Sequence, residues 1–172
     1  MKKLFLVGGV AAALVLSSGA VAAHAASMPK YKVPKIFGTT FQKDPSHDFT
    51  KGIHTRHNGI LRGWITNVSG GRAEYVPIRW KPSKEIEGYF VAPKEGDATA
   101  YASPVAANVV YLSAYGCKSL AGGAMTVDRN TGLGAKKCAR PVLLKRHDQT
   151  RYPSLITVYQ GKIVKVQEIY TP

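Results

Sequence analysis

The stretch that decides the fold is SLITVYQGKIVKVQEIY, residues Ser154–Tyr170. Apolar and polar residues alternate on both sides of Gln160-Gly161, and a period of two is typical of β-strands. A two-residue connection that contains glycine suits a tight hairpin turn, because glycine adopts a positive φ without strain. The stretch therefore predicts a C-terminal β-hairpin.

Similar signals occur upstream. The runs ILRGWITNV (60–68) and AEYVPIRW (73–80) flank SGGR and predict a second hairpin. Pro77 has no backbone N–H to donate to a neighbouring strand, so we expect its strand to lie at a sheet edge. YFVA (89–92) and PVLLKR (141–146) predict short strands.

Two readings are open for SPVAANVVYLSAYG (103–116). Ser103, Pro104 and Gly116 provide the start and stop signals of a helix, whereas the β-branched and aromatic residues of 109–115 favour a strand. We favour the strand. The fold class is then mainly β, a small antiparallel barrel or sandwich with a C-terminal β-hairpin and at most one or two short helices. The alternative is an α+β fold with a helix at about 104–115.

The N-terminus has the layout of a secretory signal peptide. Lys2 and Lys3 precede an apolar run, residues 4–16, and the sequence Ala23-His24-Ala25 predicts cleavage near Ala25 or Ala26. The apolar run is shorter than the ~20 residues that span a bilayer, so we expect no stable membrane insertion. The predicted organisation is a signal peptide (1–26), a basic extended arm (27–36) and a single mainly β domain (37–172). The protein is expected to be secreted, extracellular or associated with the cell envelope.

The chain is strongly basic. It has 24 Lys and Arg residues against 10 Asp and Glu; without Lys2 and Lys3, 22 remain against 10, a net charge of +12. Such a charge attracts polyanions, and for an exported protein we expect anionic cell-wall polymers or other surface polyanions, with only non-specific binding of nucleic acid. The candidate polyanion-binding residues are those of the segment 136–151: Lys136, Lys137, Arg140, Lys145, Arg146 and Arg151.

The chain has two cysteines, Cys117 and Cys138. An even number of cysteines in an exported protein predicts a disulfide. The alternative is a pair of free thiols, one of them a nucleophile that would need a histidine base and a cation for the oxyanion. His54 or His57 and Arg140 are the candidates for those roles.

This order, a strand that ends in a cysteine with an upstream histidine and a downstream arginine, resembles that of the sortases. The resemblance implies a wall-anchoring transpeptidase, although Gly116 stands where sortases have threonine before the cysteine. A second local resemblance is to thioredoxins, through YPSLITVYQGKIV (152–164). The thioredoxin C-x-x-C motif is absent, so that resemblance implies no disulfide exchange.

Histidines gather in HDFTKGIHTRH (47–57). The H-x-x-H spacing of His54 and His57 suits zinc on a helix, but Gly52 and Asn58-Gly59 argue against a helix there. We therefore predict an exposed polar loop, with no metal and no cofactor, and keep a histidine-dependent nuclease as the functional alternative. The pair His147-Asp148 is likewise predicted to be exposed.

Finally, VPKIFGTTFQ (33–42), which follows the basic arm, is similar to the opening of small exported proteins of Gram-positive lactic acid bacteria. Those proteins are largely of unknown function, so the resemblance implies no site residues. The sequence as a whole favours a non-catalytic cell-envelope or polyanion-binding protein. The alternatives are a secreted cysteine- or histidine-dependent hydrolase or transpeptidase, and a cationic antimicrobial protein.

Overall fold

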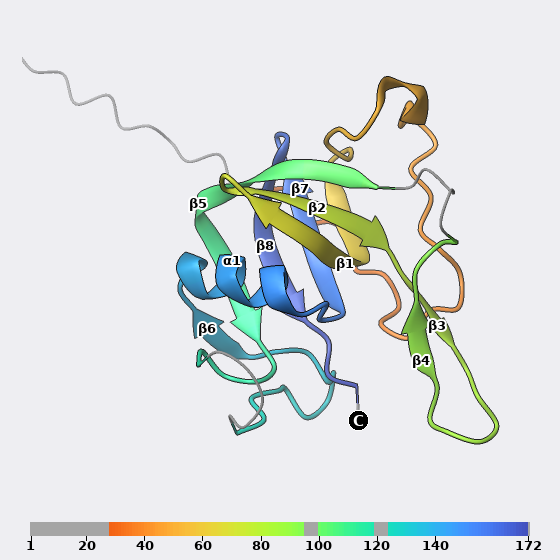
Figure 1. Cartoon of the computed structure of the whole chain (residues 1–172). Helices are drawn as coiled ribbons and strands as arrows, with labels where there is room; N and C mark the ends of the chain where they lie inside the picture. Colours follow the sequence, from red (N-terminus) through yellow and green to blue (C-terminus); the bar gives the residue numbers. More distant parts are fainter. Residues whose placement is uncertain (1–27, 95–99, 119–123, 172) are drawn as a thin grey trace, which may run out of the picture.

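The computed structural model describes residues 28–94, 100–118 and 124–171 (Figure 1). The expected signal peptide, residues 1–26, lies outside these ranges. The described chain is mainly β, as predicted, and none of its helices is long and apolar enough to cross a membrane. Its elements are η1 (Phe49–Lys51), β1 (Gly59–Ser69), β2 (Arg72–Pro77), β3 (Arg79–Lys81), β4 (Tyr89–Val91), β5 (Tyr101–Ser113), β6 (Lys136–Cys138), α1 (Arg140–Gln149), β7 (Ser154–Tyr159) and β8 (Lys162–Glu168).

Five strands close into a barrel. Neighbours follow the order β2-β1-β7-β8-β5, and the start of β5 pairs with β2 to complete the ring. β6 adds a short antiparallel strand at the far end of β5. The pairs in the ring are antiparallel except β5 and β8, which run parallel. Of the two predicted architectures, a barrel or a sandwich, the protein has the barrel, with one parallel pair that the sequence did not indicate.

The barrel closes because β1 serves two neighbours in turn. Residues 59–63 of β1 pair with β7, and its later residues pair with β2. Gly63 lies where the pairing changes, and a Cβ there would sit 2.6 Å from the carbonyl oxygen of Val76, so the bend requires glycine. Counting the barrel strands alone, the order is 1-2-3-5-4-1, with α1 between the third and fourth. That is the connectivity of the OB-fold, a five-stranded Greek-key barrel.

The C-terminal hairpin, β7 with β8, is confirmed. Its turn residues Gln160 and Gly161 have φ values of 47° and 74°, as a two-residue turn with positive φ at both positions requires. β7 lies between β1 and β8 and is covered on both faces, since Ile156 faces the barrel core while Leu155 packs outside it. Burial along β7 is therefore nearly continuous.

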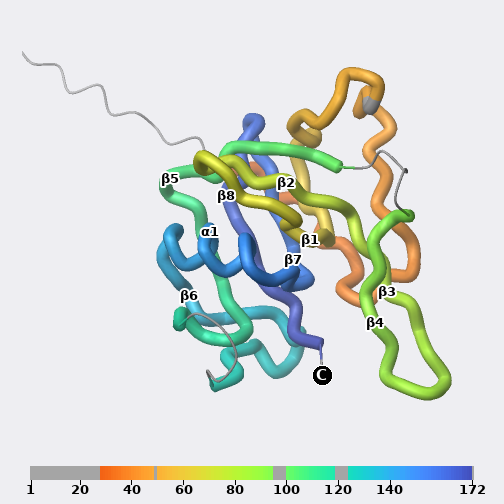
Figure 2. The backbone as a smooth tube through the Cα atoms, in the orientation of Figure 1, coloured from red at the N-terminus to blue at the C-terminus, as the bar shows by residue number. Residues whose placement is uncertain are grey.

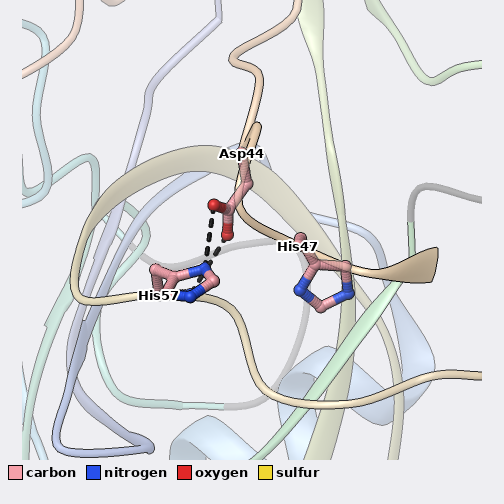
Figure 3. Close-up of side chains that lie close together, drawn as sticks. All are labelled: Asp44, His47 and His57. Carbon is pink, nitrogen blue, oxygen red and sulfur yellow. Dashed lines mark hydrogen bonds and ion pairs between the residues drawn. The ribbon is translucent and has the colours of Figure 1, made fainter. Parts of the chain in front are cut away.

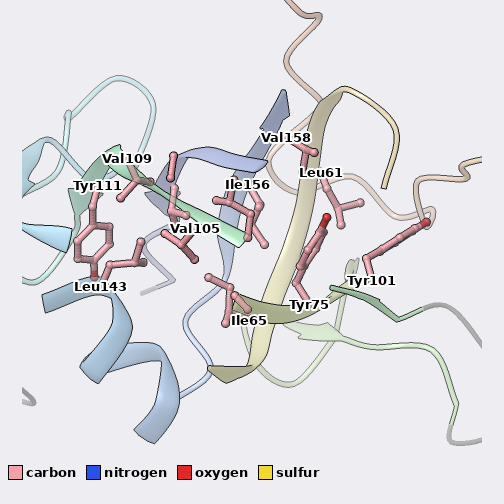
Figure 4. Packing of buried hydrophobic residues seen from close by; sticks show 14 of the residues in the cluster. Leu61, Ile65, Tyr75, Tyr101, Val105, Val109, Tyr111, Leu143, Ile156 and Val158 are labelled. Atoms are coloured by element: carbon pink, nitrogen blue, oxygen red, sulfur yellow. The ribbon is translucent and has the colours of Figure 1, made fainter. Parts of the chain in front are cut away.

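The main core fills the barrel and extends to α1 (Figure 4). Leu143 of α1 belongs to this core, together with aliphatic residues of the strands and the buried rings of Tyr75, Tyr101 and Tyr111. The hydroxyl of Tyr75 is satisfied by Ser103, 2.8 Å away, as a buried polar group requires.

A second cluster covers the outside of the barrel beneath the β3–β4 hairpin. Its buried members are Ile78, Phe90, Leu155 and Ile169. The segment around Phe37 joins it, since the Phe37 ring stands edge-on to Trp80 with centroids 4.9 Å apart. In Figure 2 this orange segment runs beside β3 and β4. The buried Arg62 side chain holds the segment in place by donating to the carbonyl oxygens of Lys35, Thr40 and Ile78.

One open choice is settled and two local predictions need correction. The favoured strand is confirmed, since residues 104–113 belong to β5, which pairs with β2 at its start and with β8 and β6 further along. PVLLKR is not a strand but forms most of α1, where Pro141 occupies the first turn and Leu, Lys and Arg are good helix formers. β2 is not an edge strand; Pro77 is tolerated because β2 pairs only with β1 beyond Tyr75.

Candidate functional site

The predicted disulfide is confirmed. Cys117 and Cys138 are bonded, with their Cα atoms 5.4 Å apart, and the chain has no free cysteine. The bond joins the segment that follows β5 to the end of β6, just before α1. A thiol held in a disulfide is not a nucleophile, so the cysteine-dependent alternatives lose their reactive group.

The histidines of the proposed thiol site lie by the other end of β5 from Cys117, and the guanidinium of Arg140 has a different partner. The carbonyl oxygen of His54 accepts a hydrogen bond from Ala102 N, at the start of β5, whereas Cys117 follows the end of that strand. His57 precedes β1, on the same side as His54. Arg140 turns away from the disulfide and donates to the carbonyl oxygen of Val105 at 3.3 Å. The structure therefore does not assemble a cysteine, histidine and arginine site.

The candidate basic residues differ in exposure. Lys136, Lys137, Lys145 and Arg151 are exposed, and Arg140 is half-buried. Arg140 is the first residue of the ten-residue helix α1 and Arg151 lies two residues beyond its end, so the length of the helix, about 15 Å, separates them. The basic residues thus cover β6 and the exposed side of α1 and do not form a single compact cluster.

Two shallow hollows flank Cys117. One, of about 390 Å³, is lined by Lys118 and Lys136 among others, and the other, of about 250 Å³, by Lys145. Lys118 was not among the sequence candidates, because it lies outside the basic segment 136–151. We call the area formed by Lys118, Lys136 and Lys145 around Cys117 the disulfide surface.

Arg146 lies beneath the disulfide surface and does not present its guanidinium to solvent. Its side chain is 2% exposed and pairs with the fully buried Glu168 at 3.3 Å. It also donates to the carbonyl oxygens of Gly116 and Lys118, each at 2.6 Å. Arg146 is therefore unavailable to a surface ligand; instead it fixes the backbone on both sides of Cys117.

Glu168 is the centre of this buried network. Besides Arg146, it accepts hydrogen bonds from the hydroxyls of Tyr111 and Ser113 and from Ala114 N. These partners come from the end of β5, while Glu168 ends β8. The network thus joins α1 to the ends of β5 and β8.

His147 lies beside the network, which corrects the prediction that it is exposed. Its ring nitrogens make no hydrogen bond, and its Nε2 is 3.7 Å from Glu168 Oε1. Tyr111 and Tyr152 stand edge-on to its ring. Burial lowers the pKa of His147 to about 4, because the effect of burial outweighs the opposing attraction of Glu168, and Arg146 adds to the lowering.

This burial predicts acid sensitivity. In the unfolded chain His147 becomes protonated as the pH falls below its ordinary pKa of 6.5. In the folded chain it stays neutral until the pH approaches its lowered pKa of about 4. Stability is therefore lost as the pH falls from 6.5 towards 4, and we expect a loss of about 2 kcal/mol between pH 7 and pH 5. Urea unfolding at a series of pH values measures it.

The matched variant is His147→Phe, which keeps an aromatic ring but cannot ionise. It should flatten the stability profile between pH 7 and pH 5 without lowering stability at pH 7. His47, His54 and His57 remain in the variant, so the difference between the two profiles reports on His147 alone. Equal profiles for the two proteins would contradict the assignment.

A separate group of titratable side chains lies at the other side of the barrel (Figure 3). Asp44, His47 and His57 each offer a ligand atom within 4.8 Å of the others. His57 Nδ1 lies 3.0 Å from Asp44 Oδ1, and His57 N donates to Asp44 Oδ2. Asp44 and His47 are buried, which corrects the prediction of an exposed polar loop for His47, whereas the side chain of His57 is 57% exposed.

The environment favours the ionised carboxylate and the neutral imidazole. Burial alone would raise the pKa of Asp44, but hydrogen bonds from His57 and the charge of Arg56 lower it more. Burial and the neighbouring His54 lower the pKa of His47. Both groups are thus in the protonation state that binds metal ions. The sequence did not single out Asp44, since Asp44-Pro45 has the composition of an ordinary turn.

No family model, curated protein or solved structure matches this chain. The function of the protein is therefore inferred from the connectivity of the barrel and the placement of its side chains.

Proposed function

We propose that this protein is a secreted, non-catalytic protein of the cell envelope that binds an anionic polymer through the disulfide surface. The observation that carries the proposal is the basic excess, 22 basic residues against 10 without the signal peptide, together with the exposure of Lys118, Lys136 and Lys145 around two hollows. Exposed lysines act as point charges that set affinity more than sequence or sugar specificity.

The local structure supports a rigid surface. The disulfide and the two hydrogen bonds from Arg146 to the backbone fix the segment that carries Lys118. A fixed surface loses less conformational entropy when it binds. OB-folds commonly bind oligonucleotides and oligosaccharides, so an extended polymer is a ligand class that this barrel accommodates; that support is an analogy of fold.

Binding to polyglycerol phosphate, an anionic phosphate polymer, tests the proposal. We expect the affinity to fall steeply with salt, because counterions are released when lysines contact the polymer. The triple variant Lys118→Gln, Lys136→Gln and Lys145→Gln should bind roughly tenfold more weakly at about 50 mM salt and show a smaller salt dependence. Equilibrium binding measured at several salt concentrations gives both quantities.

The matched control removes the same charge elsewhere. Lys84, Lys94 and Lys162 are exposed, and their replacement by Gln should change the affinity by less than about twofold. Binding that does not respond to salt, or equal losses in the two triple variants, would overturn the proposal that the disulfide surface is the binding site.

A further inference from the structure

We propose that Asp44, His47 and His57 form a binding site for a divalent transition-metal ion of the zinc class. Two imidazoles and one carboxylate are ligands that zinc takes in proteins, and three protein ligands leave a coordination position for water or an external group. We refer to the three residues as the His–Asp cluster. The proposal is independent of polymer binding, and it reverses the expectation from sequence that this loop holds no metal.

The geometry requires only a small contraction. The ligand atoms lie within 4.8 Å of one another, and tetrahedral zinc at about 2.1 Å from each ligand places them about 3.4 Å apart. In Figure 3 the carboxylate of Asp44 lies between the His57 and His47 rings. His57 Nδ1 is already at 3.0 Å from Asp44 Oδ1. On binding, the metal replaces the hydrogen bond between these atoms, and a proton on Nδ1 moves to the exposed Nε2 or to solvent.

The His47 ring is held by its neighbours. His54 stacks on it with centroids 3.8 Å apart and planes 9° from parallel. Tyr101, at the start of β5, stands edge-on to the same ring at 4.7 Å. His54 in turn places its Nδ1 2.8 Å from the carbonyl oxygen of Gly52. His54 and Tyr101 are therefore positioning residues, of the kind that orient ligands from outside the coordination sphere.

The donor set selects among metals. Imidazole nitrogens suit Zn²⁺, Cu²⁺, Ni²⁺ and Co²⁺, whereas Mg²⁺ and Ca²⁺ prefer a shell of oxygens. Two of the three ligands here are imidazoles, so the site should discriminate strongly against Mg²⁺ and Ca²⁺. Arg56 places a positive charge near Asp44, which opposes any cation and reduces the affinity for each metal alike.

The His–Asp cluster is separate from the disulfide surface. The loop that carries Asp44 and His47 and the turn of η1 lie on one side of the barrel, and α1 with β6 on the other (Figure 1). The two proposals can therefore fail independently, since neither test alters residues of the other site.

Zinc binding by the untagged secreted protein tests the inference. Equilibrium dialysis with metal analysis should give one Zn²⁺ per chain, and an excess of Mg²⁺ or Ca²⁺ should not displace it. Co²⁺ should give the visible absorption of a low-symmetry site with nitrogen and oxygen ligands. His57→Ala should weaken zinc binding at least tenfold, and because the side chain of His57 is more than half exposed, its loss should leave the fold intact.

The control is His147→Phe, which removes a histidine that lies away from the His–Asp cluster, beside Glu168. It should retain zinc binding within about twofold, since His147 is not among the three residues that offer ligand atoms to the site. Asp44→Asn should lose binding as His57→Ala does. No zinc at equilibrium, or binding that survives both His57→Ala and Asp44→Asn, would overturn the site; unchanged thermal unfolding of His57→Ala establishes that its loss of metal is local.

Discussion

Replacing Glu168 by Gln is expected to destabilise the protein by about 3–5 kcal/mol. Glu168 is fully buried and is the carboxylate that faces the buried guanidinium of Arg146. Glutamine keeps the size of the side chain and can still hydrogen bond with Tyr111 and Ser113, because both hydroxyls can turn to donate or accept. It removes the negative charge, however, and so leaves Arg146 charged and uncompensated in the interior.

The control is the charge-free pair, Arg146→Met with Glu168→Gln. Removing both charges leaves no uncompensated ion, so the double variant should lose less stability than the sum of the two single losses, by about 1–3 kcal/mol. It should still be less stable than the natural protein, because Arg146 also holds the carbonyl oxygens of Gly116 and Lys118. Urea unfolding of the four proteins measures this coupling, and strictly additive losses would show that the pair does not act as a unit.

The same two residues show where sequence analysis succeeds and where it fails. Alternation in Ser154–Tyr170 predicted the hairpin correctly because strand period is a local property. In that pattern Glu168 occupies a polar position of the kind that is usually exposed, yet it is buried. Its burial depends on α1 and the end of β5, which reach it only in the folded barrel. Nothing in the local sequence pairs it with Arg146.

The candidate sites also divide into features that the local sequence predicts and features that depend on the folded chain. The pairing of the two cysteines needed only their number and the expected export of the chain. The His–Asp cluster depends on Asp44, which is distant in sequence from His57 and is brought to it by the loop before β1. Arg146 was placed with the surface lysines because charge alone does not reveal burial, and most charged residues are indeed exposed. Closure of the barrel was unpredictable because the pairing of β2 with β5 and of β5 with β8 is non-local.

Removal of the disulfide, by replacing Cys117 and Cys138 with Ala, is expected to cost about 3 kcal/mol. The bond closes a loop with a sequence separation of 21 residues, and the cost follows from the extra conformational freedom that the unfolded chain gains when that loop opens. For a domain of this size the melting temperature should fall by roughly 10 °C. Thermal unfolding of the variant, compared with the natural protein, measures the change.

Reductant provides the matched control for this variant. When the natural protein is reduced, its stability should fall to that of the variant. The stability of the variant should not change with reductant, because it already lacks the bond. Arg146 still holds the backbone of Gly116 and Lys118 in either case, so the barrel should remain folded and only the segment around Cys117 should gain mobility.

Because Lys118 and Lys136 lie on the two sides of the bond, the loss of the bond should also weaken polymer binding more than any substitution on the β3–β4 hairpin. A natural protein that keeps its stability on full reduction would show that the bond does not contribute to the folded state.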